Sequence, residues 1–434
     1  MRDNELILYR NFKRGEILAD ASYIMSGDTQ ESDGARNRMN SLTGALVELA
    51  VSHGYEGNLW QAYLTYLIAN NENAYSTSCE IRGNVSGTIN EVAMHDFSIF
   101  REMFMLDLSE LDRICGTSNA KLLSDYKGVD ENSKMFNKRI RDRIIELRDQ
   151  LADASSDEQF AQRATQFYKE FGVGKFGLHK AFRVEHDDTG VVIKPITNIL
   201  HVYLEDLVGY ENAKKKLVEN TEAFLDGRPC NNCLLFGDAG TGKSSSIKGI
   251  LNRYYERGLR IIEVYKHQLK DINDVIGQIK NRNYKFIIYM DDLSFEEYET
   301  EYKYLKAVIE GGLEKKPDNI LIYATSNRRH IVREKFSDKE DRDDDLHTND
   351  TVQEKLSLAY RFGVTIFFAR PDKKEFDNIV KTLADRYGVK MDEEELLLEA
   401  NRWELGHGGL SGRCAQQFID HLLGLQGQDA IMPA

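Results

Sequence analysis

A glycine-rich octapeptide behind a short apolar run restricts the fold of this 434-residue chain more than any other feature. Residues 237–244 read Gly-Asp-Ala-Gly-Thr-Gly-Lys-Ser and match G-x-x-x-x-G-K-[ST], the P-loop pattern. The run before it, residues 233–236, is typical of a buried strand, and residues 245–255 have helical character. The bare pattern occurs by chance in about one or two chains in a hundred of this length. The strand, loop and helix together therefore predict a phosphate-binding α/β unit.

The residue types in this loop suit a nucleotide phosphate and its cation. Glycines allow a tight turn whose backbone N–H groups point inward. Lys243 is long enough to reach the β- and γ-phosphates, and Ser244 offers a hydroxyl to Mg²⁺. The residues expected to hold the nucleotide here are Asp238, Ala239, Gly240, Thr241, Gly242, Lys243, Ser244 and Ser245.

A second apolar run ends in two acidic residues. Residues 286–290 are followed by Asp291 and Asp292, which is the Walker B pattern. Asp291 is expected to hold Mg²⁺, directly or through water, and Asp292 is expected to orient or deprotonate the attacking water. A lone match of this kind is more often a strand that ends in a solvated turn, but the P-loop in the same chain favours the catalytic interpretation.

Composition argues against several other classes of protein. The chain is 41% hydrophobic and 29% charged, has no apolar stretch that could span a bilayer and does not begin like a signal peptide, so we expect a cytoplasmic protein without membrane insertion. Its five scattered cysteines do not suit a disulfide framework. A net charge of −14 disfavours a nonspecific coat on nucleic acid, although a local basic patch is compatible with it.

Hydrophobic periodicity divides the chain into four expected segments. They are a mainly α-helical N-terminal domain (1–175), a linker (176–199) with a short β-like stretch at 190–193, a nucleotide-binding α/β domain (200–370) and a helical lid (371–434). Amphipathic helices are expected in the first segment at 35–53, 59–69, 89–111, 136–151 and 158–171. Core strands are expected in the third at 233–236, 260–264, 286–290, 320–324 and 364–368. Because helices separate most of these strands, the pattern predicts a parallel sheet flanked by helices.

Four further motifs accompany the P-loop and the acid pair. They are Leu207-Val208-Gly209-Tyr210, Ala324-Thr325-Ser326-Asn327, Leu358-Ala359-Tyr360-Arg361-Phe362-Gly363 and Gly409-Leu410-Ser411-Gly412-Arg413. The order and spacing of all six elements resemble those of an AAA+ ATPase. This resemblance implies a P-loop AAA+ sheet followed by a C-terminal helical lid.

The AAA+ resemblance also implies a role for each motif. Leu207, Val208 and Gly209 would pack against adenine. Asn327 would be sensor 1 and position the attacking water. Arg361 would be an arginine finger that reaches the γ-phosphate bound by a neighbouring subunit, and Arg413 would be sensor 2 and contact phosphate in its own subunit. From the residue types alone, Asn327 also suits a turn cap, Arg361 an intramolecular ion pair and Arg413 an exposed helix-surface cation.

Longer motifs resemble the bacterial DUF815 family of AAA+ ATPases. They are NTEAFL, GTGKSS, DDLSFE, YATSNRRH and SGR, at residues 220–225, 240–245, 291–296, 323–330 and 411–413. The resemblance is strong from about residue 174 onward and weaker over the helical N-terminal part. It implies ATP and Mg²⁺ as ligands, ATP hydrolysis, and a homo-oligomer in the form of a ring or an open spiral. AAA+ ATPases usually carry Glu at the position of Asp292, so hydrolysis is expected to be slow, water-bridged, or assisted by Glu296 or Glu297.

These motifs are compatible with three kinds of function. The leading hypothesis is an ATPase that remodels or loads an unidentified partner protein docked on the N-terminal domain. A nucleotide-dependent assembly switch that turns over rarely fits Asp292 equally well. The third hypothesis is a DNA-associated ATPase similar to loaders, so a role for nucleic acid stays open. Threading of a protein through a pore is not expected, because residues 265–270 lack the glycine of a threading loop.

Overall fold

The computed structural model of the chain describes residues 2–26, 32–83, 86–128, 136–188, 190–197, 199, 202–295, 299, 301–310, 317–327 and 358–425. The chain divides into two compact units, Met1–His179 and Lys180–Ala434. Glu296 and Glu297, the two acids expected to assist Asp292, lie outside the described residues. Across those described ranges, no helix is long and apolar enough to cross a membrane.

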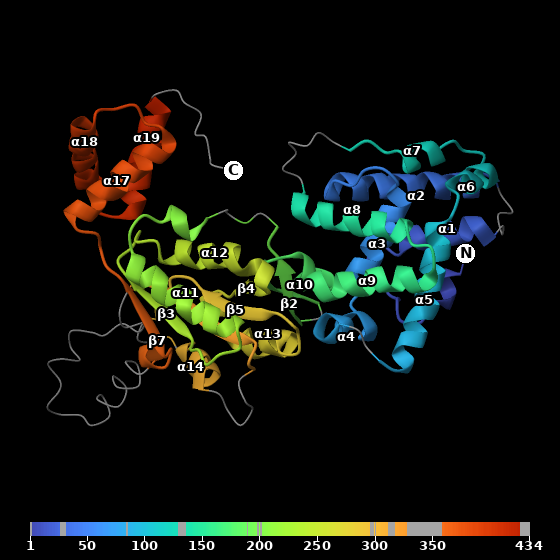
Figure 1. Cartoon of the computed structure of the whole chain (residues 1–434), viewed down its shortest axis with the longest axis horizontal. Helices are drawn as coiled ribbons and strands as arrows, with labels where there is room; N and C mark the ends of the chain where they lie inside the picture. Colours follow the sequence, from blue (N-terminus) through green and yellow to red (C-terminus); the bar gives the residue numbers. More distant parts are fainter. Residues whose placement is uncertain are drawn as a thin grey trace. The chain divides into compact units, whose positions relative to one another are not determined.

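The N-terminal unit consists of helices around a large buried apolar cluster (Figure 1). Its helices are α1 Glu16–Ser26, α2 Ser32–His53, α3 Leu59–Asn70, α4 Ala74–Arg82, α5 Thr88–Phe104, α6 Leu108–Cys115, α7 Ala120–Ser124, α8 Lys138–Ala152, α9 Asp157–Phe171 and α10 Gly174–Leu178. Helix α3 is central, since ten of its twelve residues are buried. Asn58 caps this helix by accepting a hydrogen bond from the backbone N–H of Gln61. The expected helical character of this part is confirmed.

The single helix predicted over residues 89–111 is wrong. Two helices, α5 and α6, occupy this region, and the chain turns between them at residues 105–107. Asp107 starts α6 by accepting a hydrogen bond from the backbone N–H of Ser109. Both helices bury their apolar faces in the same cluster, so the hydrophobic period continues across the turn. The Asp107 cap therefore marks where one helix ends and the next begins, and hydrophobic periodicity alone does not reveal such a cap.

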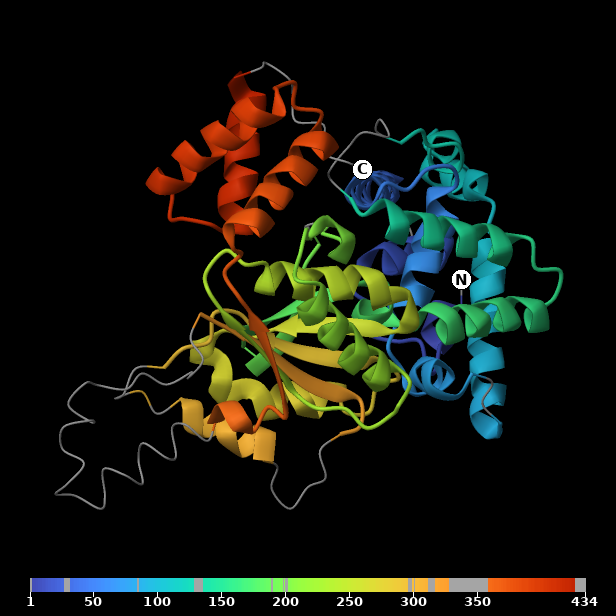
Figure 2. The same cartoon turned by 60° about the vertical axis from the view of Figure 1, so that its left-hand side comes forward.

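The second unit contains a sheet with α11 and α12 over one face and α13 and α14 over the other (Figure 2). In its described part, seven strands follow the order β2-β1-β4-β5-β6-β3-β7. The strands are β1 Ala181–Asp187, β2 Gly190–Pro195, β3 Cys233–Gly237, β4 Leu259–Glu263, β5 Lys285–Met290, β6 Ile320–Ser326 and β7 Val364–Phe368. The helices are η2 Leu204–Asp206, α11 Glu211–Leu225, α12 Lys243–Tyr254, η3 Tyr255–Arg257, η4 Lys266–Asp271, α13 Ile272–Ile279 and α14 Tyr302–Glu310. All five predicted core strands are present, and the expected α/β P-loop fold is confirmed.

The prediction of a linker over residues 176–199 is wrong, because most of this segment forms a helix and two strands. Residues 174–178 form α10, and residues 181–195 form the hairpin β1–β2. Strand β1 pairs parallel to β4 and antiparallel to β2, so this segment extends the sheet. Val184 faces Ile193 across the hairpin, and both side chains are buried. The β-like stretch expected at 190–193 lies within β2, whereas the apolar alternation of β1 is only a few residues long and its place in the sheet depends on pairing with β4.

The register of three neighbouring strands brings the predicted motifs to one edge of the sheet. Strand β6 lies between β5 and β3 and is buried along its whole length. Met290 is level with Ala324, and Leu235 is level with Thr325. The acid pair after β5 and the loop after β3 therefore emerge on either side of the end of β6. This is the carboxyl edge, where open parallel sheets bind ligands.

Three helices form the expected C-terminal lid. They are α17 Lys373–Tyr387, α18 Glu393–Gly406 and α19 Gly412–Leu425, and they share a buried apolar cluster. Asp372 and Glu375 form a capping box at the start of α17. Arg386 of the same helix donates hydrogen bonds to the backbone carbonyls of Glu205 and Asp206. These bonds connect the lid to the segment before the P-loop.

Candidate functional site

The P-loop follows β3 and leads directly into α12. Lys243, the first residue of that helix, is buried, and its Nζ donates to the carbonyl oxygens of Gly237 at 2.9 Å and Asp238 at 2.6 Å. The hydroxyl of Thr241 donates to the same Asp238 carbonyl at 2.8 Å. The loop therefore closes around its own lysine, and the ammonium group is held at the beginning of a helix whose free N–H groups favour anions.

Burial lowers the pKa of Lys243 below its ordinary value. The carboxylates of Asp292, Asp238 and Asp291 act in the opposite direction and favour the charged form, while the guanidinium of Arg413 disfavours it. An anion placed beside the ammonium group would add to the effect of the carboxylates. The electrostatics of the loop therefore suit a phosphate ligand.

The expected cation ligands meet across two strands. Ser244 Oγ donates to Asp291 Oδ1 at 2.7 Å, so the P-loop and the acid pair are in direct contact. Burial by itself raises the pKa of Asp291, but the hydrogen bonds that Ser244 and Thr325 donate lower it below its ordinary value. A hydroxyl and an ionised carboxylate are the hard oxygen ligands that Mg²⁺ accepts. In the described part of the chain no three His, Cys, Asp or Glu side chains cluster around a metal position.

Thr325 is the residue in this site that the sequence did not single out. Its side chain is 1% exposed at the end of β6. Its Oγ1 donates to Asp291 Oδ1 at 2.6 Å and accepts a hydrogen bond from the backbone N–H of Asp292 at 2.9 Å. One hydroxyl thus holds both acids of the pair. Its position within the Ala324–Asn327 motif is the available signal, but only the register with β5 reveals its partners.

Asp292 has an unusual backbone and a specific partner. Its φ of 48° lies in the left-handed region, which residues other than glycine seldom occupy. Asn327 Nδ2 donates to Asp292 Oδ1 at 2.7 Å. The structure therefore brings the expected water-activating acid and the expected sensor into contact at the end of β6. Backbone strain of this kind is concentrated at functional sites.

The segment expected to pack against adenine lies beside the P-loop. The Leu207 side chain lies next to Gly242, and its carbonyl oxygen accepts a hydrogen bond from Lys214 Nζ at 2.7 Å. Leu207 packs against the core of the sheet, whereas Val208 packs against the apolar cluster of the lid. Gly209 has a φ of 83° and open space where a side chain would be. The segment therefore connects the sheet and the lid at the loop.

The lid also contacts the loop at the start of α19. The backbone N–H of Arg413 donates to the carbonyl oxygen of Gly240 at 3.1 Å. A Cβ on Gly240, whose φ is 78°, would lie 3.0 Å from the Arg413 Cβ and 3.1 Å from the Ser411 hydroxyl, so a larger residue does not fit there. The exposed Arg413 side chain and the positive ends of two helices thus lie around one loop.

Arg361 is the one proposed catalytic residue placed elsewhere. In the parallel pair β3–β7, Cys233 is level with Val364 and Gly237 with Phe368. The P-loop follows β3, whereas Arg361 precedes β7 and therefore lies at the opposite edge of the sheet. At about 3.3 Å per residue, the length of the strand separates them by roughly 13 Å or more. The half-buried Arg361 does not meet the P-loop of its own chain.

Comparison with known proteins gave a family and a set of similar folds. A family model described as "Protein of unknown function (DUF815)" matches residues 177–426, which confirms the resemblance drawn from the motifs. No curated protein matches the sequence. Similar solved structures include RuvB of Thermotoga maritima, described as a Holliday junction branch migration motor, with 17% identity over 54% of this chain and 68% of that chain and a TM-score of 0.37. A point mutant of the same RuvB gives 18% identity over 54% and 69%, with a TM-score of 0.37.

Proposed function

Because the chain belongs to the DUF815 family, we propose that its second unit binds ATP with Mg²⁺ and hydrolyses it where two copies of the chain meet. We further propose that the N-terminal unit docks the protein on which this ATPase acts. The observation that supports the proposal best is the contact between the P-loop, the acid pair and Asn327 at one sheet edge. A P-loop alone accounts for phosphate binding, whereas the acids and the amide beside it also supply groups for a cation and for water.

Nucleotide binding is assigned to the loop and its neighbours. On binding, Lys243 exchanges its two carbonyl partners for phosphate oxygens, and the backbone N–H groups at the start of α12 face the phosphates. Leu207 and Val208 flank the adenine from the sheet side and the lid side. Arg413 reaches the phosphates from the lid. Because sheet and lid both contribute, binding is expected to bring them together.

Ser244 and Asp291 are the residues that would hold Mg²⁺. When bound there, the ion would neutralise charge on the phosphate oxygens. The hydrogen bond from Thr325 keeps Asp291 ionised and oriented toward Ser244. Groups of this supporting kind commonly set metal affinity as strongly as some direct ligands do.

Asp292 and Asn327 are assigned to the attacking water. The Asp292 carboxylate orients this water and accepts its proton, and the Asn327 amide fixes the carboxylate through its bond to Oδ1. Aspartate is one methylene shorter than the glutamate usual in AAA+ ATPases, so the proton is expected to pass through a bridging water. This geometry favours slow basal turnover.

The position of Arg361 supports a site shared between subunits. Since Arg361 lies at the sheet edge opposite its own P-loop, it reaches a γ-phosphate only if that nucleotide belongs to another copy. Gly363, which has a φ of 74°, packs against Asn231 and holds the segment after Arg361 close to β3. A head-to-tail arrangement of this kind generates a ring or an open spiral.

One observation favours a second candidate function, an assembly switch that turns over rarely. Asp292 is held in the left-handed region by the Thr325 hydroxyl and is already hydrogen-bonded to Asn327. The backbone position and the bond to Asn327 fix the direction of a short side chain, so its carboxylate reaches the attacking water only through a second, bridging water. ATP would then drive assembly more readily than it is hydrolysed.

Steady-state hydrolysis of ATP, measured over a range of protein concentrations with the mass determined in parallel, tests the proposal. The enzyme hypothesis predicts turnover per subunit that rises as copies assemble and is lost in Lys243→Ala. Lys215→Ala, which removes an exposed lysine of α11, is the matched control. Tight ATP binding and assembly with negligible turnover would favour the switch. Unchanged ATP affinity in Lys243→Ala would show that the P-loop does not bind the nucleotide.

A further inference from the structure

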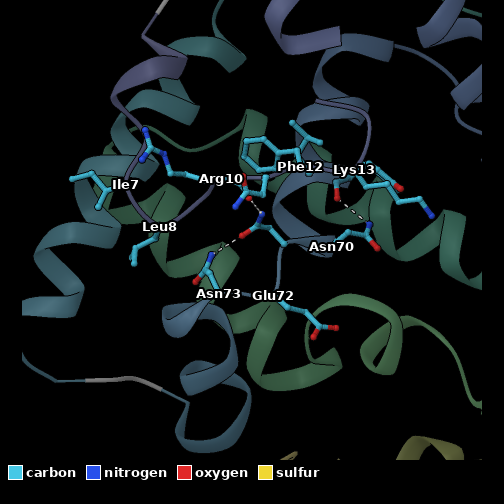
Figure 3. Close-up of a pocket in the computed structure, with 12 residues that line it drawn as sticks. Ile7, Leu8, Arg10, Phe12, Lys13, Asn70, Glu72 and Asn73 are labelled. Atoms are coloured by element: carbon cyan, nitrogen blue, oxygen red, sulfur yellow. Dashed lines mark hydrogen bonds between the residues drawn. The ribbon is translucent and has the colours of Figure 1, made fainter. Parts of the chain in front are cut away.

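The N-terminal unit contains a cavity of about 440 Å³ that the proposed chemistry does not use. Two segments far apart in the sequence line it (Figure 3). One is residues 7–13, here called the strap, and the other is residues 66–73 at the end of α3 and the following turn. The cavity lies within the volume range of ligand sites, about 300–1,000 Å³. We call it the strap cavity.

A buried carboxylate anchors the first half of the strap. Asp96 of α5 has no exposed surface, and its oxygens accept hydrogen bonds from the backbone N–H groups of Ile7, Leu8 and Tyr9 at 2.7–3.1 Å. The Tyr9 hydroxyl pairs with that of Tyr168 at 2.8 Å. Burying a charge is costly unless it is fully hydrogen-bonded, and here backbone groups of the strap supply most of those bonds, with the His95 ring 3.1 Å from Oδ1. The strap is therefore fixed before any ligand binds.

The second half of the strap has a strained backbone. Asn11 has a φ of 55°, and Arg14, which directly follows the strap, has a φ of 66°; both values lie in the left-handed region. Two side chains hold this conformation: Asn71 Nδ2 donates to the Arg10 carbonyl at 2.8 Å, and the Tyr63 hydroxyl donates to the Arg14 carbonyl at 2.8 Å. Strained residues persist where their surroundings over-determine them, and such residues are concentrated at ligand sites.

The strap presents two cations to the cavity. Arg10 and Lys13 are exposed, and neither makes an ion pair with the part of the chain that the structure describes. Glu72 is the acidic residue of the described lining, but its carboxylate lies against Gly174 at the start of α10 (Figure 3). The exposed charge of the strap itself is therefore positive, on a chain whose overall charge is −14.

Apolar side chains complete the wall. Leu8, Phe12, Tyr66 and Leu67 line the cavity, and Ile7, which is 54% exposed, also belongs to the lining. An apolar wall with two adjacent cations is complementary to an apolar side chain flanked by carboxylates. Recognition of this kind discriminates by charge, because neutral and basic peptides leave the cations without counter-charge.

We propose that the strap cavity binds a short acidic segment of the partner protein, with an apolar side chain in the cavity and carboxylates facing Arg10 and Lys13. This inference rests on the proposed docking role of the N-terminal unit and adds the chemistry of the partner to it. The preformed strap contributes by reducing the loss of conformational freedom on binding. The acidic surface elsewhere repels an acidic segment at long range, so binding depends on these two cations.

Fluorescence anisotropy of the full-length protein tests the proposal directly. The probe is a fluorescein-labelled peptide that carries a leucine between glutamates, and no nucleotide is added. We expect a Kd on the order of 10 µM that weakens as NaCl is raised. A matched peptide with glutamine in place of each glutamate is expected to bind at least about tenfold more weakly.

Charge reversal in the strap provides the decisive variant. Arg10→Glu combined with Lys13→Glu is expected to weaken the acidic peptide at least about tenfold. Lys121→Glu, which reverses an exposed lysine of α7 outside the cavity lining, is the matched control and should bind as wild type does. If circular dichroism shows that the double reversal is misfolded, Arg10→Gln with Lys13→Gln replaces it. ATP affinity should be equal in all these variants, so failure of this inference is distinguishable from failure of the ATPase proposal.

Three results would overturn the proposal. The acidic peptide fails to bind wild type, or binds wild type and the folded strap variant alike. The third such result is displacement of the peptide by inorganic phosphate at the same concentration as the peptide. It would mean that the cations attract any anion and that the apolar wall plays no part.

Discussion

The two units place their functional polar side chains in different environments. In the N-terminal unit, buried polar groups bind one another and the backbone: Asp96 holds the strap, and the Tyr75 hydroxyl pairs with that of Thr165 at 2.7 Å. In the second unit, here called the nucleotide unit after its proposed ligand, polar groups gather at the carboxyl edge of the sheet, where Lys243 donates hydrogen bonds to two carbonyl oxygens of its own loop. Groups of the first kind hold a shape, whereas we propose that groups of the second kind exchange these partners for a ligand.

The difference also explains why one unit is easier to interpret than the other. The exchangeable groups of the nucleotide unit need glycine turns and strand ends close by in sequence, and these form recognisable motifs. A buried carboxylate such as Asp96 needs only a partner in three dimensions, and its backbone partners in the strap lie 87 to 89 residues away. Four experiments test whether this contrast holds.

The largest expected effect is a loss of ATP turnover when the arginine supplied by a neighbouring copy is removed. Arg361→Ala should bind ATP as wild type does but lose turnover by about 10³-fold, since an arginine supplied by a neighbour stabilises the transition-state charge. Mixing inactive Arg361→Ala with inactive Asp292→Asn should restore part of the turnover. Arg228→Ala, at an exposed arginine of the same unit, is the control. Mixed assemblies that form but recover no turnover would contradict a finger acting between subunits.

The second largest effect is expected on the stability of the N-terminal unit, where Asp96 holds the strap in place. Asp96→Asn places an amide among three N–H donors and should lower the free energy of unfolding of the N-terminal unit by about 3 kcal/mol. ATP affinity should not change. Urea denaturation followed by the fluorescence of Trp60, in a Trp403→Phe background, reports on this unit alone because the chain has two tryptophans. Glu110→Gln in α6 is the control. An unchanged urea midpoint in Asp96→Asn would show that this carboxylate does not anchor the strap.

A smaller effect is expected at the support of the metal ligand. Thr325→Val keeps the shape of the side chain but removes the hydroxyl that holds Asp291 and Asp292, so Mg²⁺-dependent ATP affinity should fall by about 30-fold. Thr325→Ser retains the hydroxyl and should stay close to wild type. Titration with Mg²⁺ at constant ATP measures both variants. Equal affinity in the valine and serine variants would show that the hydroxyl has no part in binding.

The smallest expected effect is a pH dependence. The folded-state pKa of Asp291 is lowered, so its contribution to stability is present above the unfolded value of 3.8 and is lost as the pH falls through the folded pKa. Thr325→Val removes one of the hydrogen bonds that lower this pKa. The difference in free energy of unfolding between wild type and Thr325→Val should therefore shrink below about pH 3.8, by less than about 1 kcal/mol because the site is partly solvated. If this difference in free energy of unfolding instead grew on acidification, the folded-state pKa of Asp291 would not be lowered by the Thr325 hydroxyl.

Much of the nucleotide unit was predictable from local patterns. The five core strands were expected within two residues of their observed ends, because short apolar runs bounded by polar turns mark buried parallel strands. The P-loop and the acid pair were also expected, and the structure places Ser244, Asp291, Asp292 and Asn327 in one hydrogen-bonded group. The chemical roles of these residues stay predictions for the experiments above.

Other features were not predictable in this way. Residues 181–187 read as part of a linker because their apolar pattern is short, and they join the sheet through pairing with β4 on one side and with β2 on the other. Thr325 was visible within a motif, but its hydroxyl has no recognisable partner until β6 is placed beside β5. The strap cavity joins residues 7–13 to residues 66–73, and no periodicity relates these segments.

The sequence by itself determined the local chemistry of this protein: a phosphate loop on a strand, an acid pair on another strand, and a helical N-terminal region. These properties depend on backbone turns and on side-chain periods within a few residues. Only the tertiary structure decided which strands are neighbours, which hydroxyl supports the acid pair, on which edge Arg361 lies, and where the strap encloses a cavity. The reason is that buried polar groups must find partners wherever packing places them, and packing joins residues that sequence separation keeps apart.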